Sequence, residues 1–470
     1  LNQTGQIPGS YQDVADEIAS NYGDYLFFQN NLTFDQVKEI FAGLPQFIGG
    51  LPPEDQAAFM QYLGALQQGA YVPEQDYNND IMYTTRLRLG MHADVMDNVT
   101  FDGRLSMYKT WGDSTGVQVF NGIHNSINVD GTTASVPNSD ILRVDRAYFN
   151  WKKLGGSNWY LSIGRRPSTF GPPLHVSMNE LRQGTPNGHV VDFQFDGITV
   201  GVTLNDWLPG NTFRFCYGLG FESGFGSADQ LKAPADRLND THLGGINWDL
   251  YNTDRMHIQT TILGAWGVAD GFNGLLVLPT DPVSGNAVPA PAVLRFTPSA
   301  ELGDIYLADV LIERKDGPID WFASLAYSET NPTEATSPFG GLLSDPFEVP
   351  EKQDGYSIYL GARFEVGAKD SLGLEYNYGS QYWFNFTQAA DDLVASKLAT
   401  RGSAYEAYWL HEFKQGLGRA RAKFQLGATL YDYEYSGSGF QTGAPKELGG
   451  DDIPVLGFPT YKDALDIRAA

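Results

Sequence analysis

The sequence is poor in cysteine, in long apolar runs and in positive charge. Its 470 residues contain one cysteine, Cys216, so no intrachain disulfide framework can form. The longest apolar runs are far shorter than the roughly 18 residues that a transmembrane helix requires, which excludes a helical membrane protein. Lysine and arginine number 31 against 56 aspartate and glutamate, a formal net charge of -25 that argues against nucleic acid as a partner.

The residues that are abundant indicate a β-rich chain. Glycine occurs 53 times, and the sequence holds 28 phenylalanine, 25 tyrosine and 9 tryptophan residues. This composition is unusual for a soluble enzyme and suits close-packed strands with an aromatic surface. The chain begins at Leu1 with polar residues and shows no signal peptide, so we expect a processed or trimmed form, and a cytoplasmic location does not follow.

Enzyme motifs are weak. The seven histidines show no His-Glu-x-x-His spacing, and neither a Gly-x-Ser-x-Gly elbow nor a phosphate-binding loop is present. Cys216 stands between Phe215 and Tyr217 in an alternating stretch, which predicts an inert inward-facing thiol rather than a nucleophile. We therefore predict that the protein is not an enzyme.

Residues 1–79 form a separate acidic region with helical periodicity. They contain ten acidic residues against one lysine and no arginine. Thr33 and Gln36 have the spacing of a capping box, and Pro53 begins a second stretch with apolar residues on one helical face. Two interpretations stay open for this region: a helical subdomain or packing arm, or a segment that plugs a pore.

From Asp80 onward the apolar period changes from 3.6 to 2. In residues 81–89 apolar side chains alternate with Arg86 and Arg88, and residues 99–108 repeat the pattern after a short break. This alternation predicts a β-hairpin with one apolar face and one charged face.

The same pattern recurs along the chain and predicts sixteen strands. These are residues 80–94, 98–110, 141–152, 158–166, 189–196, 198–205, 212–221, 241–250, 255–266, 303–314, 319–329, 355–366, 371–380, 403–413, 419–432 and 459–469.

The predicted connections alternate between short and long. Seven are short, at about 95–97, 153–157, 197, 251–254, 315–318, 367–370 and 414–418. Eight are mostly long, at about 111–140, 167–188, 206–211, 222–240, 267–302, 330–354, 381–402 and 433–458. An even strand count with short turns at one end is the layout of an outer-membrane barrel. We predict an all-β fold: a transmembrane antiparallel β-barrel of about 16 strands over 80–470, behind a short α-helical region over 1–79.

The polar face of the strands carries the candidate pore-lining residues. A soluble sheet could also alternate, but a Lys or Arg that faces lipid costs about 2–4 kcal/mol at mid-bilayer, and the opposite face is nearly free of charge at mid-strand. Residues 356–366 and 420–430 show this best, and a slip of one residue would turn Arg421 and Lys423 towards lipid. The candidate pore-lining residues are Arg86, Arg88, Asp102, Arg104, Arg146, Arg166, Glu180, Arg363, Glu365, Arg421 and Lys423.

Aromatic residues gather near the strand ends. Amphipathic rings suit the two headgroup layers of a membrane. The predicted girdles contain Trp151, Trp159, Trp248, Trp266, Trp321, Tyr327 and Tyr378.

One stretch resembles a known family. Residues 146–151 read Arg-Ala-Tyr-Phe-Asn-Trp, and after a glycine turn residues 159–166 read Trp-Tyr-Leu-Ser-Ile-Gly-Arg-Arg. Together they resemble a hairpin of the Gram-negative outer-membrane general-diffusion porins, in which an Arg-x-Ala-Tyr-x-Gly strand leads to a strand that ends Leu-Gly-Arg. The whole chain also looks like an uncharacterised family of proteobacterial porin-like proteins with a helical N-terminal extension.

The resemblance implies a function and an assembly. It implies a homotrimer in the outer membrane of a Gram-negative bacterium, in which small hydrophilic solutes or ions diffuse through a water-filled pore. It also implies that residues 167–188 fold inward and narrow the pore. We expect arginines of the first four strands to face Glu180 across this constriction; the alternative is that they pair with Asp94, Asp102 and Asp145 and are structural.

The sequence departs from the porins at both ends. Barrels of that family end in an aromatic residue, whereas this sequence ends Asp466-Ile467-Arg468-Ala469-Ala470, so we expect that the last residues are missing or that the insertion signal differs. Residues 1–79 have no counterpart in general porins. They are the candidate contact for a periplasmic or surface-layer partner.

Several alternatives stay open. The acidic residues of the long loops allow a structural Ca²⁺ that bridges to lipopolysaccharide, or simply form a solvated surface, and we expect no other cofactor. They are Asp229, Asp236, Asp240, Asp281, Asp345, Asp391, Asp392, Asp451 and Asp452. Arginines in the lumen favour anions, and acidic loop mouths favour cations. Two other functions fit the chain: a structural barrel that sheaths a redox partner or anchors the envelope, and a soluble β-rich carbohydrate binder.

Overall fold

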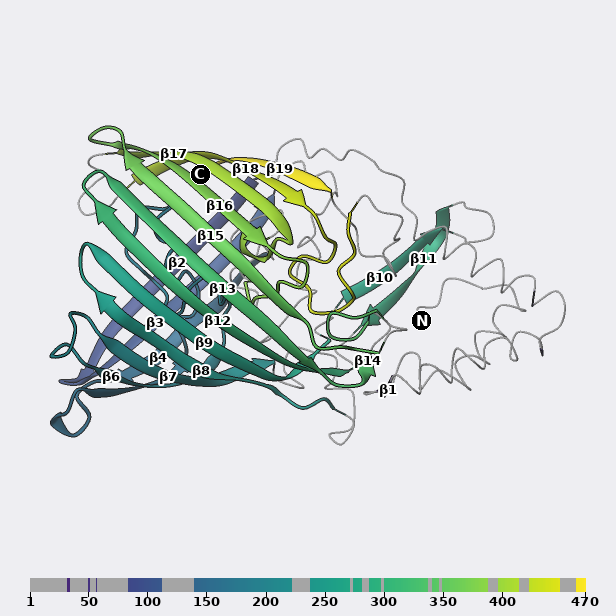
Figure 1. Cartoon of the computed structure of the whole chain (residues 1–470), viewed down its shortest axis with the longest axis horizontal. Coiled ribbons are helices and arrows are strands. Elements are labelled where there is room, and N and C mark those ends of the chain that lie inside the picture. The colour runs from purple at the N-terminus through teal and green to yellow at the C-terminus, as the bar shows by residue number, and fades with distance from the viewer. Residues whose placement is uncertain are drawn as a thin grey trace.

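A computed structural model gives the fold of the chain (Figure 1). It describes residues 83–111, 139–221, 237–270, 274–280, 287–296, 300–336, 340–345, 349–387, 396–413, 422–448 and 462–470, together with Leu32–Thr33, Gly50 and Gln56. The helices predicted within residues 1–79 lie outside these described residues.

Among the described residues, fifteen strands form one antiparallel sheet, and each strand pairs with the next strand of that sheet along the chain. The strands are β2 (Tyr83–Met96), β3 (Val99–Trp111), β4 (Ser139–Trp151), β5 (Trp159–Arg165), β6 (Asp196–Thr203), β7 (Thr212–Phe221), β8 (Thr241–Asn252), β9 (Met256–Ala269), β12 (Glu301–Asp316), β13 (Ile319–Pro332), β15 (Asp354–Glu365), β16 (Asp370–Gly379), β17 (Gly402–Phe413), β18 (Ala422–Tyr433) and β19 (Asp463–Ala469).

The prediction of a strand at 189–196 is wrong, because residues 189–195 do not join the sheet and Asp196 belongs to β6. Their backbone pairs with another loop instead: Asp192 N donates to Phe386 O at 2.6 Å, and Phe386 N donates to Val190 O at 2.9 Å. The segment has the alternation of a strand, but Val190, Val191 and Phe193 are buried inside the curved sheet rather than on its outer face. Periodicity does not distinguish a strand of the sheet from an extended segment packed within it.

This correction also changes the class of two connections. No turn exists at residue 197, which lies within β6, and residues 204–211 join β6 to β7 at the short-turn end rather than the long-loop end. With that change, seven short turns and seven long connections alternate along the sheet.

The sequence did not predict the small pairings among the long connections. The connection between β9 and β12 contains a hairpin of β10 (Gly274–Thr280) and β11 (Ala287–Phe296), which projects from the long-loop end (Figure 1). In addition, β1 (Leu32–Thr33) pairs with β14 (Ala335–Thr336), which follows β13.

The sheet curves around a shared interior. Figure 1 shows β12, β13 and β15 in front of β2 and β3, with loops between the two layers. We call the face towards these loops the inner face and the opposite one the outer face. The edge strands are β2 and β19, and within the described part of the chain no hydrogen-bonded pairing joins them.

The outer face is apolar, as the alternation predicts. On β15, Tyr356 and Leu360 point outward and are 51% and 41% exposed, while Tyr359 and Arg363 point inward and are buried. On β18, Leu426 and Leu430 alternate in the same way with buried inward residues. No helix within the described ranges is long and apolar enough to cross a membrane.

Glycines on the inner face leave room for aromatic rings of neighbouring strands. Gly373 on β16 lies opposite Tyr408 on β17, and a Cβ atom at Gly373 would lie 1.9 Å from the Tyr408 ring. Gly361 and Phe322 form the same arrangement between β15 and β13, where the distance would be 2.3 Å. Part of the glycine excess therefore serves ring packing across strands.

Candidate functional site

Residues 166–195 join β5 to β6 and lie against the inner face of the sheet; we call this segment the inner loop. On one side, Lys423 Nζ on β18 donates to the backbone oxygens of Met178 and Asn179 at 2.6 and 3.0 Å. On the other side, Arg146 Nη1 on β4 donates to the backbone oxygen of Gln183 at 2.9 Å. Because β18 and β4 stand near opposite ends of the sheet order, the sheet must wrap around the loop.

A chain of side-chain contacts crosses the seam between the edge strands β2 and β19. Lys423 Nζ lies 3.4 Å from Glu180 Oε1, and Gln183 Nε2 donates to Glu180 Oε2 at 2.8 Å. Arg104 Nη1 on β3 then donates to Gln183 Oε1 at 2.8 Å. The inner loop thus connects strands on both sides of the seam.

A β-bulge concentrates charge on β4. Arg104 is paired with Arg146 across the β3–β4 ladder, whereas the next residue, Leu105, is paired with Val144, so Asp145 is the extra residue. Asp145 is fully buried and accepts from Arg104 Nε at 2.5 Å. The bulge lets two consecutive residues, Asp145 and Arg146, both reach groups on the inner face.

Four arginines of the first three strands form a basic surface, which we call the arginine wall: Arg86, Arg88, Arg104 and Arg146. Arg86 stacks over the ring of Tyr108 at 4.1 Å, which holds its guanidinium flat against the sheet. Both Arg86 and Arg88 are half-buried. Arg104 pairs with Asp145, so the structural alternative for these arginines holds for Arg104.

Asp249 on β8 is the centre of a second charged cluster. Its carboxylate oxygens lie 3.2 Å from Arg182 Nη1 of the inner loop and 2.7 Å from Arg214 Nη2 of β7. They also lie 2.8 Å from His257 Nε2 and accept from Gln259 Nε2 at 2.7 Å, both on β9. Asp249 is almost fully buried, and these donors replace the water that its charge loses on burial.

His257 is held between two carboxylates. Its Nδ1 lies 2.6 Å from Glu313 Oε2 on β12, and its Nε2 lies 2.8 Å from Asp249 Oδ1. A neutral imidazole has one donor only, so one nitrogen lone pair would face a carboxylate oxygen. The two carboxylates therefore favour the imidazolium form, which donates from both nitrogens, while Arg182 Nη1 at 3.2 Å from Nε2 opposes it.

His189 fixes the base of the inner loop. Its Nδ1 lies 2.9 Å from Ser324 Oγ on β13 and its Nε2 lies 2.8 Å from Ser357 Oγ on β15. The ring also contacts Tyr359 and Trp383, with centroids 5.6 and 5.5 Å away. Burial lowers the pKa of His189 to about 3, so the ring is neutral and accepts a hydrogen bond from one serine while it donates to the other.

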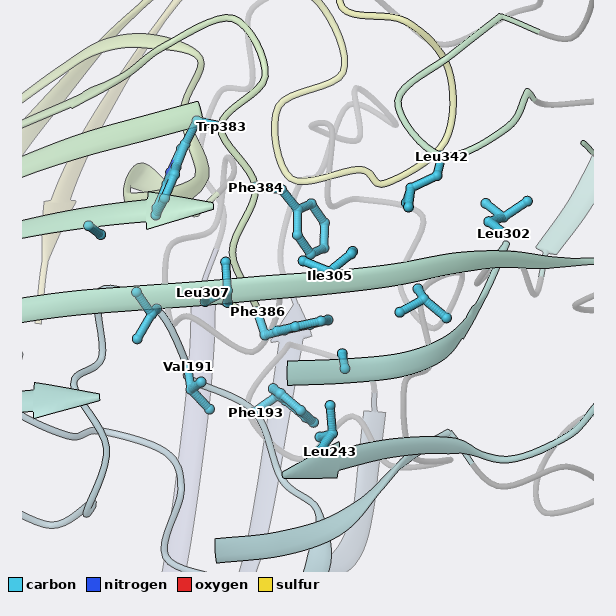
Figure 2. Close-up of a cluster of buried hydrophobic side chains, with 14 of the residues drawn as sticks. Val191, Phe193, Leu243, Leu302, Ile305, Leu307, Leu342, Trp383, Phe384 and Phe386 are labelled. Atoms are coloured by element: carbon cyan, nitrogen blue, oxygen red, sulfur yellow. The ribbon is translucent and has the colours of Figure 1, made fainter. Parts of the chain in front are cut away.

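An apolar core fills part of the interior. Figure 2 shows Val191 and Phe193 of the inner loop close to Phe386 of the connection between β16 and β17, with Ile305 of β12 nearby. The members of this core are Val190, Val191, Phe193, Leu243, Ala265, Val268, Ala300, Leu302, Ile305, Leu307, Ala326, Leu342, Trp383, Phe384 and Phe386. The core joins the inner loop, the β13–β15 and β16–β17 connections and the inner face of the sheet into one packed body.

The connection between β16 and β17 is fixed by two buried cations. Lys397 Nζ lies 2.6 Å from Glu375 Oε2 on β16 and also contacts Glu406 on β17. Arg401 is fully buried and donates to four backbone oxygens, two of which belong to Ser436 and Gly437 of the β18–β19 connection. Burial lowers the pKa of Arg401 to about 9, and its guanidinium joins the two long loops.

The predicted pore-lining residues divide into two groups. Arg104, Arg146, Glu180, Arg363 and Lys423 contact the inner loop or belong to it; Arg363 Nη1 donates to Val176 O at 2.8 Å. Arg166 is the first residue of the inner loop and lies over Tyr148 of β4 at 5.1 Å. The remaining predicted residues have other surroundings: Asp102 pairs with His92 at 2.6 Å, Glu365 pairs with Lys315 at 3.2 Å near the short turns, and Arg421 lies outside the described residues.

The predicted girdle residues lie on the outer face at both strand ends. Trp151 and Trp159 at the short-turn end are each 47% exposed, and Trp266 and Tyr327 at the long-loop end are 40% and 43% exposed. Trp248, Trp321 and Tyr378 are half-buried. The sequence missed Trp207 in the β6–β7 turn, which is 66% exposed and stacks on Trp248 at 6.3 Å.

The acidic loop residues are only partly described. Asp345 pairs with Lys446 at 2.8 Å, and Asp240 is half-buried. The remaining seven lie outside the described residues. Among the residues that the structure describes, no group of three or more His, Cys, Asp or Glu is placed to hold a metal ion.

The sequence missed the residues that fix the inner loop. Asp249 and His257 lie on polar faces of predicted strands, so their inward direction could have been read from the alternation. Their partner Arg182 could not, because its pairing with Asp249 joins positions 67 apart. Gln183 gave no signal, since isolated polar residues in a loop are ordinarily solvated. His189 was predicted to begin the strand 189–196, and its contacts with Ser324 and Ser357 join positions more than 130 residues apart.

Comparisons with known proteins identify a family for the chain and several similar solved structures. A family model described as "Protein of unknown function (DUF3373)" matches residues 76–470, which confirms the resemblance to an uncharacterised family. No curated protein matches the chain. A loop-deletion mutant of OmpT, an outer membrane protein of Vibrio cholerae, is 13% identical with a TM-score of 0.38, over 74% of this chain and 91% of that chain.

Two further solved structures are similar to a comparable extent. OmpF of Salmonella typhi in complex with daunomycin is 10% identical with a TM-score of 0.40, over 80% of this chain and 90% of that chain. An anion-selective porin from Comamonas acidovorans is 11% identical with a TM-score of 0.38, over 77% of this chain and 83% of that chain.

Proposed function

The chain belongs to the family described as a protein of unknown function (DUF3373), and we propose that it forms a closed outer-membrane β-barrel through which small hydrophilic solutes diffuse past the inner loop. The observation that carries the proposal is the position of that loop. Contacts from Lys423 on β18 and from Arg104 and Arg146 on β3 and β4 hold it across the interior, where it would narrow a passage.

The outer face supports a membrane location. Large apolar side chains along β2, such as Leu87, Leu89 and Met91, are 50–60% exposed, and a soluble protein rarely leaves a continuous apolar face in water. This argues against the soluble carbohydrate binder. In a bilayer the backbone N–H and C=O groups of the edge strands β2 and β19 must also find hydrogen-bond partners, because unpaired backbone groups in hydrocarbon are costly. This requirement supports closure of the sheet.

The electrostatics support a weak preference for anions. The arginine wall and Lys423 place cations on both sides of the inner loop, and Glu180, which lies 3.4 Å from Lys423, is 40% exposed. An excess of cations along the passage biases the traffic of small ions without a fixed binding site. We propose a homotrimer on the resemblance to the porins alone; native mass spectrometry of the detergent-purified protein would measure the subunit number.

Planar-bilayer recording of the full chain tests the channel. Leu181 at the loop is 87% exposed, so we expect Leu181→Trp to lower the unit conductance and Leu181→Ala to raise it. As a matched control, Leu208→Trp in the exposed β6–β7 turn leaves conductance unchanged. Removal of residues 1–79 shows whether that region obstructs the pore. If neither the full chain nor any of these variants gives conductance steps, the channel proposal is wrong.

A structural barrel is the second candidate, and one observation favours it. The apolar core around Trp383, Phe384 and Phe386 fills interior volume that an open pore would leave to water (Figure 2). Such a barrel would anchor a periplasmic or surface-layer partner through residues 1–79. An insulated interior would give no conductance steps in the same recordings, together with full resistance of the folded chain to protease.

A further inference from the structure

His175 has a distinct environment at the part of the inner loop that we call the tip, residues 174–183. Its neighbours Leu174 and Val176 pack into an apolar cluster that contains Phe322 of β13 and Tyr359 of β15. The His175 side chain is 21% exposed, and its buried Nδ1 has no hydrogen-bond partner. The imidazole is therefore inserted against the inner face of the sheet, and the carboxylate oxygen near it, Glu313 Oε1 at 3.7 Å, lies beyond hydrogen-bond distance.

The charged groups that face His175 are already paired with one another. Glu313 Oε1 of β12 lies 3.7 Å from His175 Nδ1, but the other oxygen of that carboxylate binds His257 of β9. Arg182 of the tip and Arg214 of β7 share Asp249 of β8.

Arg363 of β15 is a further cation that faces His175, and it is paired with Asp320 of β13. The cluster so far holds four cations against three carboxylates, with His257 counted as the imidazolium. A proton on His175 would add a fifth cation.

We propose that His175 is a proton-sensitive latch: the neutral imidazole holds the tip against the inner face of the sheet, and its protonation releases the tip and widens the passage. This inference rests on the proposed function, since it describes the regulation of the same constriction.

The direction of the effect follows from linkage. Burial, together with Arg182, His257 and Arg363, lowers the pKa of His175 below its usual 6.5, although Glu313 partly opposes this. A released tip would return the ring to water and to the ordinary pKa. Acid therefore favours the released state: docking is complete above about 6.5 and weakens as the pH falls below that value.

Only the tip is expected to move. Its polar contacts with the sheet include those of Arg182 with Asp249, of Arg363 with the Val176 oxygen, of Asn179 with Glu412, of Lys423 with Glu180 and the Met178 and Asn179 oxygens, and of Arg104 and Arg146 with Gln183. The base of the loop is held by His189 between two serines and by Phe193 in the apolar core, and neither depends on the protonation of His175.

A probe at the tip tests the latch without any need for conductance. In a Cys216→Ser background, Leu181→Cys carries a spin label, and its mobility is measured in detergent between pH 7.5 and 5. We expect mobility to rise with a midpoint below 6.5, and His175→Gln to abolish this rise. His175→Phe, a second permanently neutral variant, guards against a folding defect of the first. His92→Gln, at an exposed histidine of β2, should leave the rise intact.

Recordings of the same proteins separate the two proposals. The latch predicts that unit conductance rises on acidification in the wild-type chain and stays constant in His175→Gln. A label that is equally immobile at both pH values, or a rise that persists in both neutral variants, overturns the latch even if the channel conducts. A label that is mobilised by acid in a chain without conductance steps supports the latch and refutes the channel.

Discussion

Arg182 of the inner loop lies 3.2 Å from Asp249 of β8, which places a loop cation on a buried carboxylate that also serves Arg214 and His257. Asp249 is therefore the point at which the tip of the loop, two arginines and a histidine depend on one side chain. Its position on the inner face gives this single residue control of both the stability of the sheet and the placement of the loop.

Asp249→Asn should be strongly destabilising, because it removes the charge that compensates Arg182, Arg214 and His257. Loss of one partner from a buried ion pair typically costs about 3–5 kcal/mol. Urea unfolding in detergent, followed by the gel shift between folded and heated forms, measures the change. Asp316→Asn, at an exposed carboxylate paired with Arg314 near the β12–β13 turn, is the matched control and should leave the midpoint unchanged. Equal midpoints for the two variants would show that the Asp249 cluster contributes nothing.

The arginine wall predicts a change in ion selectivity. Arg86→Ala together with Arg88→Ala removes two half-buried cations of the inner face, so the permeability ratio of anions to cations should fall while unit conductance changes little. Reversal potentials in a salt gradient across a planar bilayer measure the ratio. Lys315→Ala removes a cation near the short turns and should leave the ratio as it was. An unaltered reversal potential in the double variant would contradict the role of the wall.

Gly373→Ala tests the ring packing between β16 and β17. The added methyl group would lie 1.9 Å from the ring of Tyr408, so the ring or the strand must move, at a cost of about 1–3 kcal/mol. Thermal unfolding in detergent measures the loss. Gly90→Ala on β2 has nothing within 4 Å of the new atom, and no comparable loss is expected there. Tolerance of alanine at both positions would exclude a steric role for Gly373.

His189 predicts both a structural and a pH effect. His189→Ala leaves the hydroxyls of Ser324 and Ser357 buried without their partner, which should cost about 1–3 kcal/mol of stability. Exposed His92→Ala provides the comparison. Chemical unfolding at neutral pH should separate the two variants clearly.

Acid should weaken the docking of His189 in a defined direction. Its pKa is lowered to about 3, so the stability that the neutral ring contributes is complete above about 6.5 and is lost as the pH falls towards 3. Unfolding midpoints measured across this range in a His175→Gln background isolate the effect from the latch. A flat profile there would mean that the ring is solvated in the folded protein.

Most of the sheet could be predicted from the sequence, and the exceptions have one cause. Fifteen of the sixteen predicted strands coincide with strands of the sheet within a few residues, because each alternates apolar and polar side chains. Residues 189–196 alternate as well, yet they pair with Phe386 of another loop. Local alternation indicates that a segment is extended, with one apolar and one polar face, but it does not indicate what either face contacts.

The sequence predicted which face of the sheet the candidate side chains lie on, but it did not predict their partners. The sequence predicted that Arg86, Arg146, Arg363 and Lys423 point away from the apolar face, because a charged side chain would be costly there. Of these, Arg146, Arg363 and Lys423 contact the inner loop. It expected Glu180 to face the arginines of the first strands, whereas Glu180 contacts Lys423 of β18 directly and reaches Arg104 only through Gln183. That choice depends on where the loop crosses the interior, which is a property of the curved arrangement of strands.

By itself, the sequence determined the two faces of the sheet, its approximate strand count and the aromatic ends of its strands, since each of these is set by neighbours within a few residues. Only the tertiary structure decided that residues 166–195 and the β16–β17 connection pack together inside the sheet, and that Asp249, His257 and His175 meet there. These contacts join positions tens to hundreds of residues apart. They form because the curved sheet brings its loops into a shared interior, where burial makes every unpaired charge costly and therefore selects its partners.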